Sequence, residues 1–208
     1  MAVLGPAGIH TGQFPWPDQA VGYGEEPLQI GPEDWPECAR AVRARALAET
    51  SAAFAAGGLD LDAVCQELAD RLASVLVGDS LIRPVGFGGA ERLPVALGPR
   101  GSNRKLARVV EADPWALAAA CSARAVEMGR SILLPELSVK CLRLWSAAAA
   151  WPSLDELGIG SMVVAPVRAG GRPLGSMLVW RAGAGPPLGT WDQLFVKEVA
   201  ARLAAAYR

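Results

Sequence analysis

Two apolar runs separated by a short glycine turn constrain the fold of this chain more than any other feature. The first run covers residues 161–167 and the second covers residues 173–181. Both contain valine, which is enriched in strands. The turn between them contains Gly170 and Gly171. Extended runs joined by so short a turn predict an antiparallel β-hairpin.

Two helices are predicted before this hairpin. Residues 37–54 form an Ala-rich, charged segment with helical periodicity. Residues 60–76 place apolar side chains every three or four positions. Asp60 is expected to cap this second helix, and Gly78 is expected to end it.

A second pair of extended runs, residues 80–85 and 93–97, predicts another hairpin. Pro84 and Pro94 lack the N–H group that a sheet ladder needs. We therefore expect both strands to be irregular or to lie at an edge of the sheet.

The remaining elements define the fold class. Residues 102–157 are predicted to be helical, with a short extended interruption at 131–134. Thr190 and Gln193 have the spacing of a capping box, which predicts the start of a final helix. The order of helices and strands predicts an α+β domain with an antiparallel sheet rather than a βαβ repeat.

The first 36 residues differ from the rest, because proline and glycine interrupt any helix or strand. This segment also carries Phe14, Trp16, Tyr23 and Trp35. We expect an irregular aromatic arm over residues 1–36 and a domain over residues 37–208. The arm is expected to pack on its own domain, on a dimer partner, or over a pocket as a lid.

Charge and targeting signals bound the function. The chain of 208 residues has 20 basic and 21 acidic residues, so it lacks the basic excess that non-specific binding to nucleic acid requires. A role at a membrane surface is equally unsupported. The first residues lack the pattern of a secretory signal, and no long apolar run is present. A cytoplasmic protein is expected.

The cysteines predict buried, reduced thiols. Cys38, Cys65, Cys121 and Cys141 form no C-x-x-C pair, and His10 is the only histidine of the chain. This spacing is unlike that of a zinc site, so no metal is expected.

The C-terminal part of the sequence resembles the second half of a GAF domain. The resemblance rests on Leu-Gly-Ile-Gly-Ser-Met-Val-Val-Ala-Pro-Val at 157–167, Gly-Arg-Pro-Leu-Gly-Ser-Met-Leu-Val-Trp-Arg at 171–181, and the helix led by Thr-Trp-Asp-Gln-Leu-Phe at 190–195. It extends over about residues 59–207 and is similar to the versions found in actinobacterial signalling proteins.

The resemblance implies a central antiparallel sheet flanked by helices, with the N- and C-terminal helices on one side. A ligand pocket is implied on the other side, roofed by the middle helical segment. Residues 37–54 and 192–207 would pair between two subunits and form a homodimer.

The residues present do not match the motifs of the family's known activities. Free methionine sulfoxide reductases of this fold carry Gly-Val-Cys-Gly, whereas Cys121 and Cys141 have other neighbours. The Asn-Lys-Phe-Asp-Glu motif of cyclic-nucleotide-binding members is absent, and His10 lies outside the resembling region, which argues against haem or bilin. No cofactor and no catalytic residue are therefore expected.

An apolar pocket with a few polar groups is expected instead. Arg83 is a candidate ligand contact because a guanidinium on a core-facing strand needs an acceptor or an anion. Packing of the same side chains in an ordinary core, or an outward-facing Arg83, are the alternatives. The candidate ligand-binding residues are Arg83, Trp115, Cys121, Trp145, Trp151, Ser161 and Met177.

The expected function is that of a homodimeric sensory or regulatory domain, which binds a small molecule and signals by contact with a partner protein. One alternative is a small biosynthetic or redox enzyme that uses the same pocket as its active site. Another is an interaction module whose pocket has no ligand.

Overall fold

The computed structural model describes residues 37–55, 60–84, 95–99, 104–113 and 116–206. The predicted aromatic arm, residues 1–36, lies outside these ranges. The strands of the described residues form one antiparallel sheet of five strands, in the order β2-β1-β5-β4-β3.

The predicted central hairpin is confirmed by β4 (Ile159–Ala169) and β5 (Arg172–Ala182), which pair along their length. Gly170 and Gly171 connect them with φ values of 56° and 80°. Glycine adopts this left-handed conformation without the steric cost that a Cβ atom brings. Both strands are buried over most of their residues, so both faces of the hairpin are covered.

The second predicted strand pair is also confirmed, by β1 (Asp79–Pro84) and β2 (Ala96–Gly98). The expected edge position is right for β2 and wrong for β1, which lies between β2 and β5. Pro84 is the last residue of β1, so its missing N–H interrupts the ladder only at the strand end. The opposite edge of the sheet is β3 (Ile132–Leu134).

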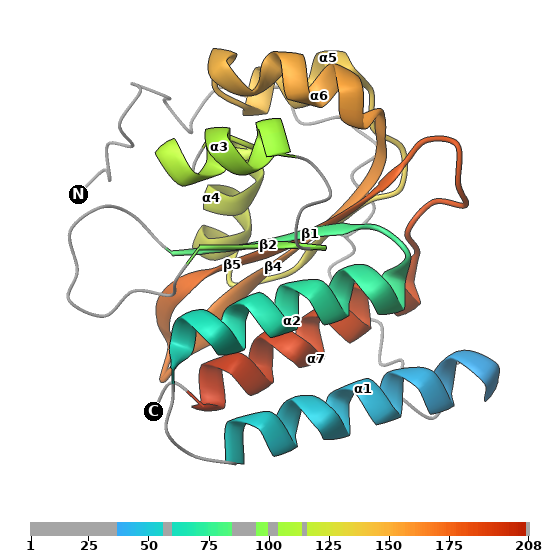
Figure 1. Cartoon of the computed structure of the whole chain (residues 1–208), viewed down its shortest axis with the longest axis vertical. Coiled ribbons are helices and arrows are strands. Elements are labelled where there is room, and N and C mark those ends of the chain that lie inside the picture. Colours follow the sequence, from blue (N-terminus) through green and yellow to red (C-terminus); the bar gives the residue numbers. More distant parts are fainter. Residues whose placement is uncertain (1–36, 56–59, 85–94, 100–103, 114–115, 207–208) are drawn as a thin grey trace.

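Helices cover both faces of this sheet, which gives the predicted α+β architecture (Figure 1). One face carries α1 (Glu37–Ala55), α2 (Leu61–Leu76) and α7 (Thr190–Ala206). The other face is covered by a roof, made of α3 (Arg104–Ala112), α4 (Ala119–Met128), α5 (Val139–Trp145), a 3₁₀ turn (Ala148–Ala150) and α6 (Trp151–Leu157). Among the described helices, none has the length and apolar content needed to cross a membrane.

The sheet separates two hydrophobic cores. Side chains that alternate along each strand point to opposite faces. Ile82 therefore belongs to the core under α1, α2 and α7, which we call the bundle-side core. Leu81, its neighbour, belongs to the core under the roof, which we call the roof-side core.

The helix ends confirm one predicted cap and correct another. The side chain of Asp60 accepts hydrogen bonds from the amides of Asp62 and Ala63, as expected for an N-cap. The capping box of Thr190 and Gln193 is wrong, because Thr190 is already the first residue of α7. Asp192 occupies the third helical position and accepts a 2.8 Å hydrogen bond from Gly189 N.

The start of β4 requires glycine at position 160. A Cβ atom built there would lie 2.4 Å from Gly183 Cα and 2.9 Å from Gly183 N. Both contacts are to backbone, so the two strand ends would have to separate. Gly160→Ala is expected to lower the free energy of unfolding by roughly 1–2 kcal/mol, as overpacking does elsewhere. Urea denaturation would measure this.

Gly189→Ala is the matched control for that variant. No described residue lies within 4 Å of a Cβ atom built at Gly189, and its φ is not in the left-handed region. The control should lose only a few tenths of a kcal/mol, because glycine caps a helix slightly better than alanine does. Equal losses in both variants would show that close backbone approach is not the reason for Gly160.

Candidate functional site

The roof-side core lies between the sheet and the roof helices. Its floor is formed by apolar side chains of the strands, and its cover by side chains of α3 to α6. Two tryptophans, Trp145 of α5 and Trp180 of β5, are each only 1% exposed. The other large members are Leu81, Leu106, Leu117, Ile132, Leu134, Leu142, Leu154, Ile159, Met162 and Leu178.

Arg83 places a cation inside this apolar layer. Since Leu81 faces the roof, strand alternation turns Arg83 to the same face, and its side chain is completely buried. Its guanidinium donates to the carbonyl oxygens of Leu117 and Ala118, the latter at 2.9 Å. It also donates to the hydroxyls of Ser122 and, at 3.4 Å, Ser176. Arg83 therefore joins the floor of the core to the segment that begins α4.

The segment held by Arg83 has an unusual backbone. Ala118 has a φ of 47° and precedes α4 without a side-chain cap. Its amide donates to the Ser146 hydroxyl at 2.9 Å, while its carbonyl accepts from Arg83. Ala147 N donates to Ala116 O at 2.8 Å. Arg83 and the α5 end thus fix this turn from two sides.

Burial sets the protonation of the ionisable groups in this core. It lowers the pKa of Arg83 to about 9, an effect opposed by the nearby Cys121 and Asp113. Burial also raises the pKa of the Cys121 thiol to about 12, against the opposing influence of Arg83. Cys121 therefore remains a protonated thiol at neutral pH, which is a weak nucleophile.

The thiols are expected to differ in reactivity for the same reason. Burial raises the pKa of Cys65 to about 12 as well, whereas Cys141 is only partly buried. In a Cys38→Ser background, a disulfide reagent at pH 8 should modify Cys141 and leave Cys65 and Cys121 intact. Peptide mass mapping would check this, and rapid modification of Cys121 would contradict it.

The same shifts affect stability at high pH. The folded protein holds the protons of Cys65 and Cys121 up to a pKa of about 12, above their ordinary value of 9.0. Their contribution to stability is therefore complete below pH 9 and is lost as the pH rises from there toward 12.

The structure brings together three of the predicted site residues: Arg83, Cys121 and Trp145 all belong to the roof side of the sheet. It does not bring Met177 there, because Met177 belongs to the bundle-side core. Trp151 is 40% exposed, and its ring lies under the Arg143 guanidinium at 5.5 Å. Trp115 lies outside the described residues.

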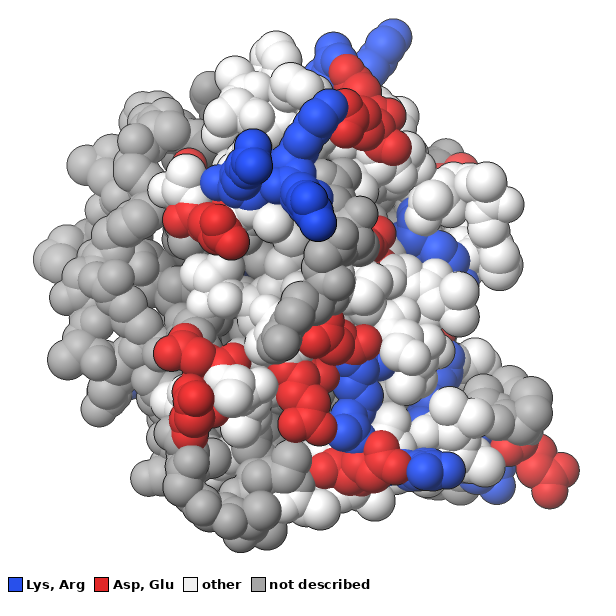
Figure 2. All heavy atoms as spheres, viewed as in Figure 1, with Lys and Arg blue, Asp and Glu red and all other residues white. Residues whose placement is uncertain are grey.

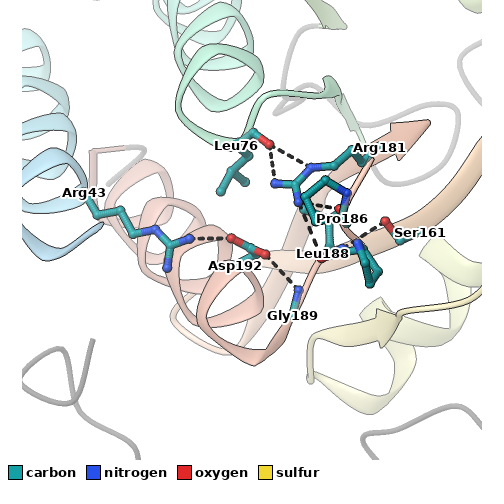
Figure 3. Close-up of polar contacts among 9 residues, drawn as sticks. Arg43, Leu76, Ser161, Arg181, Pro186, Leu188, Gly189 and Asp192 are labelled. Carbon is teal, nitrogen blue, oxygen red and sulfur yellow. Dashed lines mark hydrogen bonds and ion pairs between the residues drawn. The ribbon is translucent and has the colours of Figure 1, made fainter. Parts of the chain in front are cut away.

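Ser161 also faces away from the roof, because it alternates with Met162 of the roof-side core. Its hydroxyl accepts a 3.0 Å hydrogen bond from Leu188 N, in the segment that leads into α7 (Figure 3). Ser161 and Met177 were predicted from their residue types and their place in a strand. That prediction did not consider which face of the sheet each side chain occupies. A consistent count along the strands would have separated them from Arg83.

Three participants were missed by sequence reasoning. Ser176 lies opposite Arg83 in the β1–β5 register, and Ser122 lies one residue after Cys121. Both are small hydroxyl residues of a kind found throughout the chain, so no sequence pattern distinguishes them. Trp180 could have been found from the sequence. It lies two residues after Leu178 in the same strand, so the two side chains share one face of the sheet.

The bundle side holds a separate polar group of residues (Figure 3). Arg43 of α1 forms a buried ion pair with Asp192 of α7, and the Arg43 guanidinium lies 5.7 Å from the Phe195 ring centre. Arg181 donates to Leu76 O at 3.1 Å and to Pro186 O at 2.7 Å. The ion pair fastens α1 to α7, and Arg181 of β5 connects the end of α2 with the segment before α7.

The exposed charges are of mixed sign on the face drawn in Figure 2. Glu49 bonds to both Arg45 and Arg71, and Lys105 pairs with Glu156. Pairs of this kind neutralise one another, whereas Figure 2 also shows a cluster of basic side chains in the upper part of this face. Within the described residues, no three His, Cys, Asp or Glu side chains lie close enough to hold a metal ion.

Solved structures share this architecture. The GAF domain of an Acinetobacter phosphoenolpyruvate-protein phosphotransferase matches with a TM-score of 0.54 and 13% identity, over 83% of this chain and 94% of that one. The A. Aeolicus nlh2 GAF domain in an inactive state matches with a TM-score of 0.54 and 13% identity, over 81% and 97%. Identities this low establish the fold and nothing more.

A third solved structure is an enzyme with the same fold. Free methionine-R-sulfoxide reductase from Neisseria meningitidis, in complex with its substrate, matches with a TM-score of 0.54 and 14% identity, over 83% of this chain and 92% of that one. No curated protein matches the sequence. The family model for the GAF domain matches residues 60–207, which is most of the sequence, and the chain therefore belongs to the GAF domain family.

Proposed function

We propose that this GAF domain is a homodimeric regulatory module that binds a small, mainly apolar molecule in the roof-side core and signals by contact with a partner protein. GAF domains generally serve as sensory or ligand-binding regulatory domains. The observation that carries the proposal is Arg83, a fully buried cation whose bonds connect the sheet to the start of α4. A ligand that enters beside these bonds would change the position of the roof.

The sheet provides a route from the ligand to the helices on the far side. β1 and β5 have one face in the roof-side core and the other in the bundle-side core. A shift of the floor would reach α7, which packs on β4 and β5, and then α1 through Arg43 and Asp192. Two packed layers that move together are a physical basis for coupling between sites.

The dimer is proposed to form through α1 and α7. In this chain α1 packs on α2 and α7 and contributes Ala46 and Leu47 to the bundle-side core. The flank of α1 beside this packed side exposes Val42, which is 55% accessible. A second copy of the chain would cover this flank, as helical bundles cover apolar seams.

Native mass spectrometry of the protein purified from its own host tests the proposal. A dimer that carries a reproducible extra mass is expected. Ala125→Leu, at a completely buried position of the roof-side core, should lose the extra mass. Ala112→Leu, at an exposed position of α3, should keep it. A clean dimer or monomer with no added mass in repeated host preparations would overturn ligand binding.

The enzyme alternative has less support from the site. The thiol of Cys121 lies near Arg83 in this core, but burial suppresses its ionisation and leaves it a weak nucleophile. The similarity to a methionine sulfoxide reductase is a similarity of fold. We therefore propose ligand binding, rather than catalysis, as the function of this site.

A further inference from the structure

The indole N–H of Trp180 is an unmatched donor inside the roof-side core. The Trp180 side chain is 1% exposed, and its Nε1 atom has no hydrogen-bond partner among the described residues. A buried donor without an acceptor costs free energy that a folded protein rarely leaves uncompensated. The group therefore points to an acceptor that is supplied from outside the described residues.

The place of Trp180 in the sheet separates it from Arg83. Trp180 pairs with Met162 of β4 and with Asp79 of β1, whereas Arg83 pairs with Ser176 of β5. Ser176 and Trp180 are four positions apart on one strand, which is about 13 Å at the rise of a strand. Both face the roof, with apolar Leu178 between them. The floor thus has a charged donor at one end and a neutral donor at the other.

The surroundings restrict what the acceptor can be. The Arg83 guanidinium disfavours a cationic ligand and is already engaged by Leu117, Ala118, Ser122 and Ser176. A carboxylate at Trp180 would lose its hydration in exchange for one neutral N–H group, which is a poor exchange. A neutral acceptor needs only that one bond.

We propose that Trp180 donates its indole N–H to a carbonyl oxygen or ring nitrogen of an uncharged, mainly apolar ring compound. Trp145 and Trp180 both belong to the core that this compound would enter, and aromatic faces of this kind pack well on flat rings. The inference rests on the proposed function, because it names the ligand class and one contact of the same site.

Two pairs of probes with matched shapes test this contact: quinoline with naphthalene, and 1-indanone with indane. In each pair only the first compound carries an acceptor. Protein labelled with ¹⁵N in tryptophan would be titrated with each probe, and Trp180→Phe would identify the Trp180 indole signal. The acceptor compounds should move that signal downfield and bind about 3- to 10-fold more tightly than the hydrocarbons.

Trp180→Phe should abolish this preference while it retains binding of the hydrocarbons. Trp151→Phe is the control, because the Trp151 indole already donates to Arg143 O at 3.3 Å and to Ser146 O at 3.4 Å. It should keep the preference of the wild type. If Trp180→Phe does not fold, the two probe pairs still decide the question on the wild-type protein.

Three results would overturn the inference. Equal binding within each pair, with no movement of the Trp180 signal, would remove Trp180 as a donor. A magnetisation-transfer peak from water to the Trp180 indole proton, unchanged by the probes, would show that a buried water is the acceptor. Failure of all four probes to bind would exclude the ligand class. The proposed function would survive each result if host-purified protein still carried its extra mass.

Discussion

Arg83→Met is expected to lower the free energy of unfolding by about 2–4 kcal/mol. Methionine fills a similar volume, but it leaves the carbonyls of Leu117 and Ala118 buried without the donor that Arg83 supplies. Removal of the charge returns part of this loss, because the lowered pKa of Arg83 shows that its charged form is unfavourable in this core. The hydroxyls of Ser122 and Ser176 can rotate, whereas the two carbonyls are fixed by the backbone.

Urea denaturation measures the loss, and hydrogen exchange locates it. The amide of Ser122, which donates to Ala118 O at 3.1 Å in the first turn of α4, should exchange faster in Arg83→Met. Amides of α2, on the other side of the sheet, should follow only the change in global stability. Arg108→Met, an exposed position of α3, should unfold as the wild type does. A stability of Arg83→Met equal to that control would show that the roof does not depend on Arg83.

The fold was largely predictable because its elements are marked locally. Two long apolar runs and two adjacent glycines predict the β4–β5 hairpin. The capping residue Asp60 marks the start of α2. The errors came where tertiary context decides. β1 is an interior strand in spite of Pro84, because the proline ends the strand and the ladder with β5 precedes it.

The site was less predictable, because a site depends on which face each side chain takes and on what packs above it. Arg83, Cys121 and Trp145 share one side of the sheet, but two acceptors of Arg83 are the backbone carbonyls of Leu117 and Ala118. A backbone carbonyl has no signature in the sequence. Ser161 and Met177 have suitable chemistry and lie in suitable strands, yet they serve the opposite side.

Asp192→Ala is expected to lower the free energy of unfolding by about 3 kcal/mol. The helix most affected should be α1. Asp192 carries two roles: it pairs with Arg43, and it accepts the amide of Gly189 at the start of α7. The side chains of Arg43 and Asp192 are only 11% and 12% exposed, so water compensates poorly for a missing partner. Hydrogen exchange of α1 amides should therefore accelerate more than that of β4 and β5.

A double-mutant cycle separates the two roles of Asp192. Asp192→Asn retains an acceptor for Gly189 N but loses the charge that faces Arg43, whereas Arg43→Met keeps an apolar stem over Phe195. The double variant should be more stable than the sum of the single losses predicts, by about 1–2 kcal/mol. Arg45→Met is the control, because its pair with Glu49 is exposed and should contribute nothing measurable.

Additive losses in this cycle would mean that Arg43 and Asp192 do not act together, and the proposed route from the sheet to α1 would lose this buried polar link. Coupling between Arg43 and Asp192 would show that the two side chains act together and would support the proposed route. α1 precedes the region matched by the family model, which begins at residue 60. A buried ion pair is specific in geometry and costly to break, so it fixes α1 in one position on α7. A roof movement that reaches α7 would then displace the surface that we propose a second copy of the chain covers.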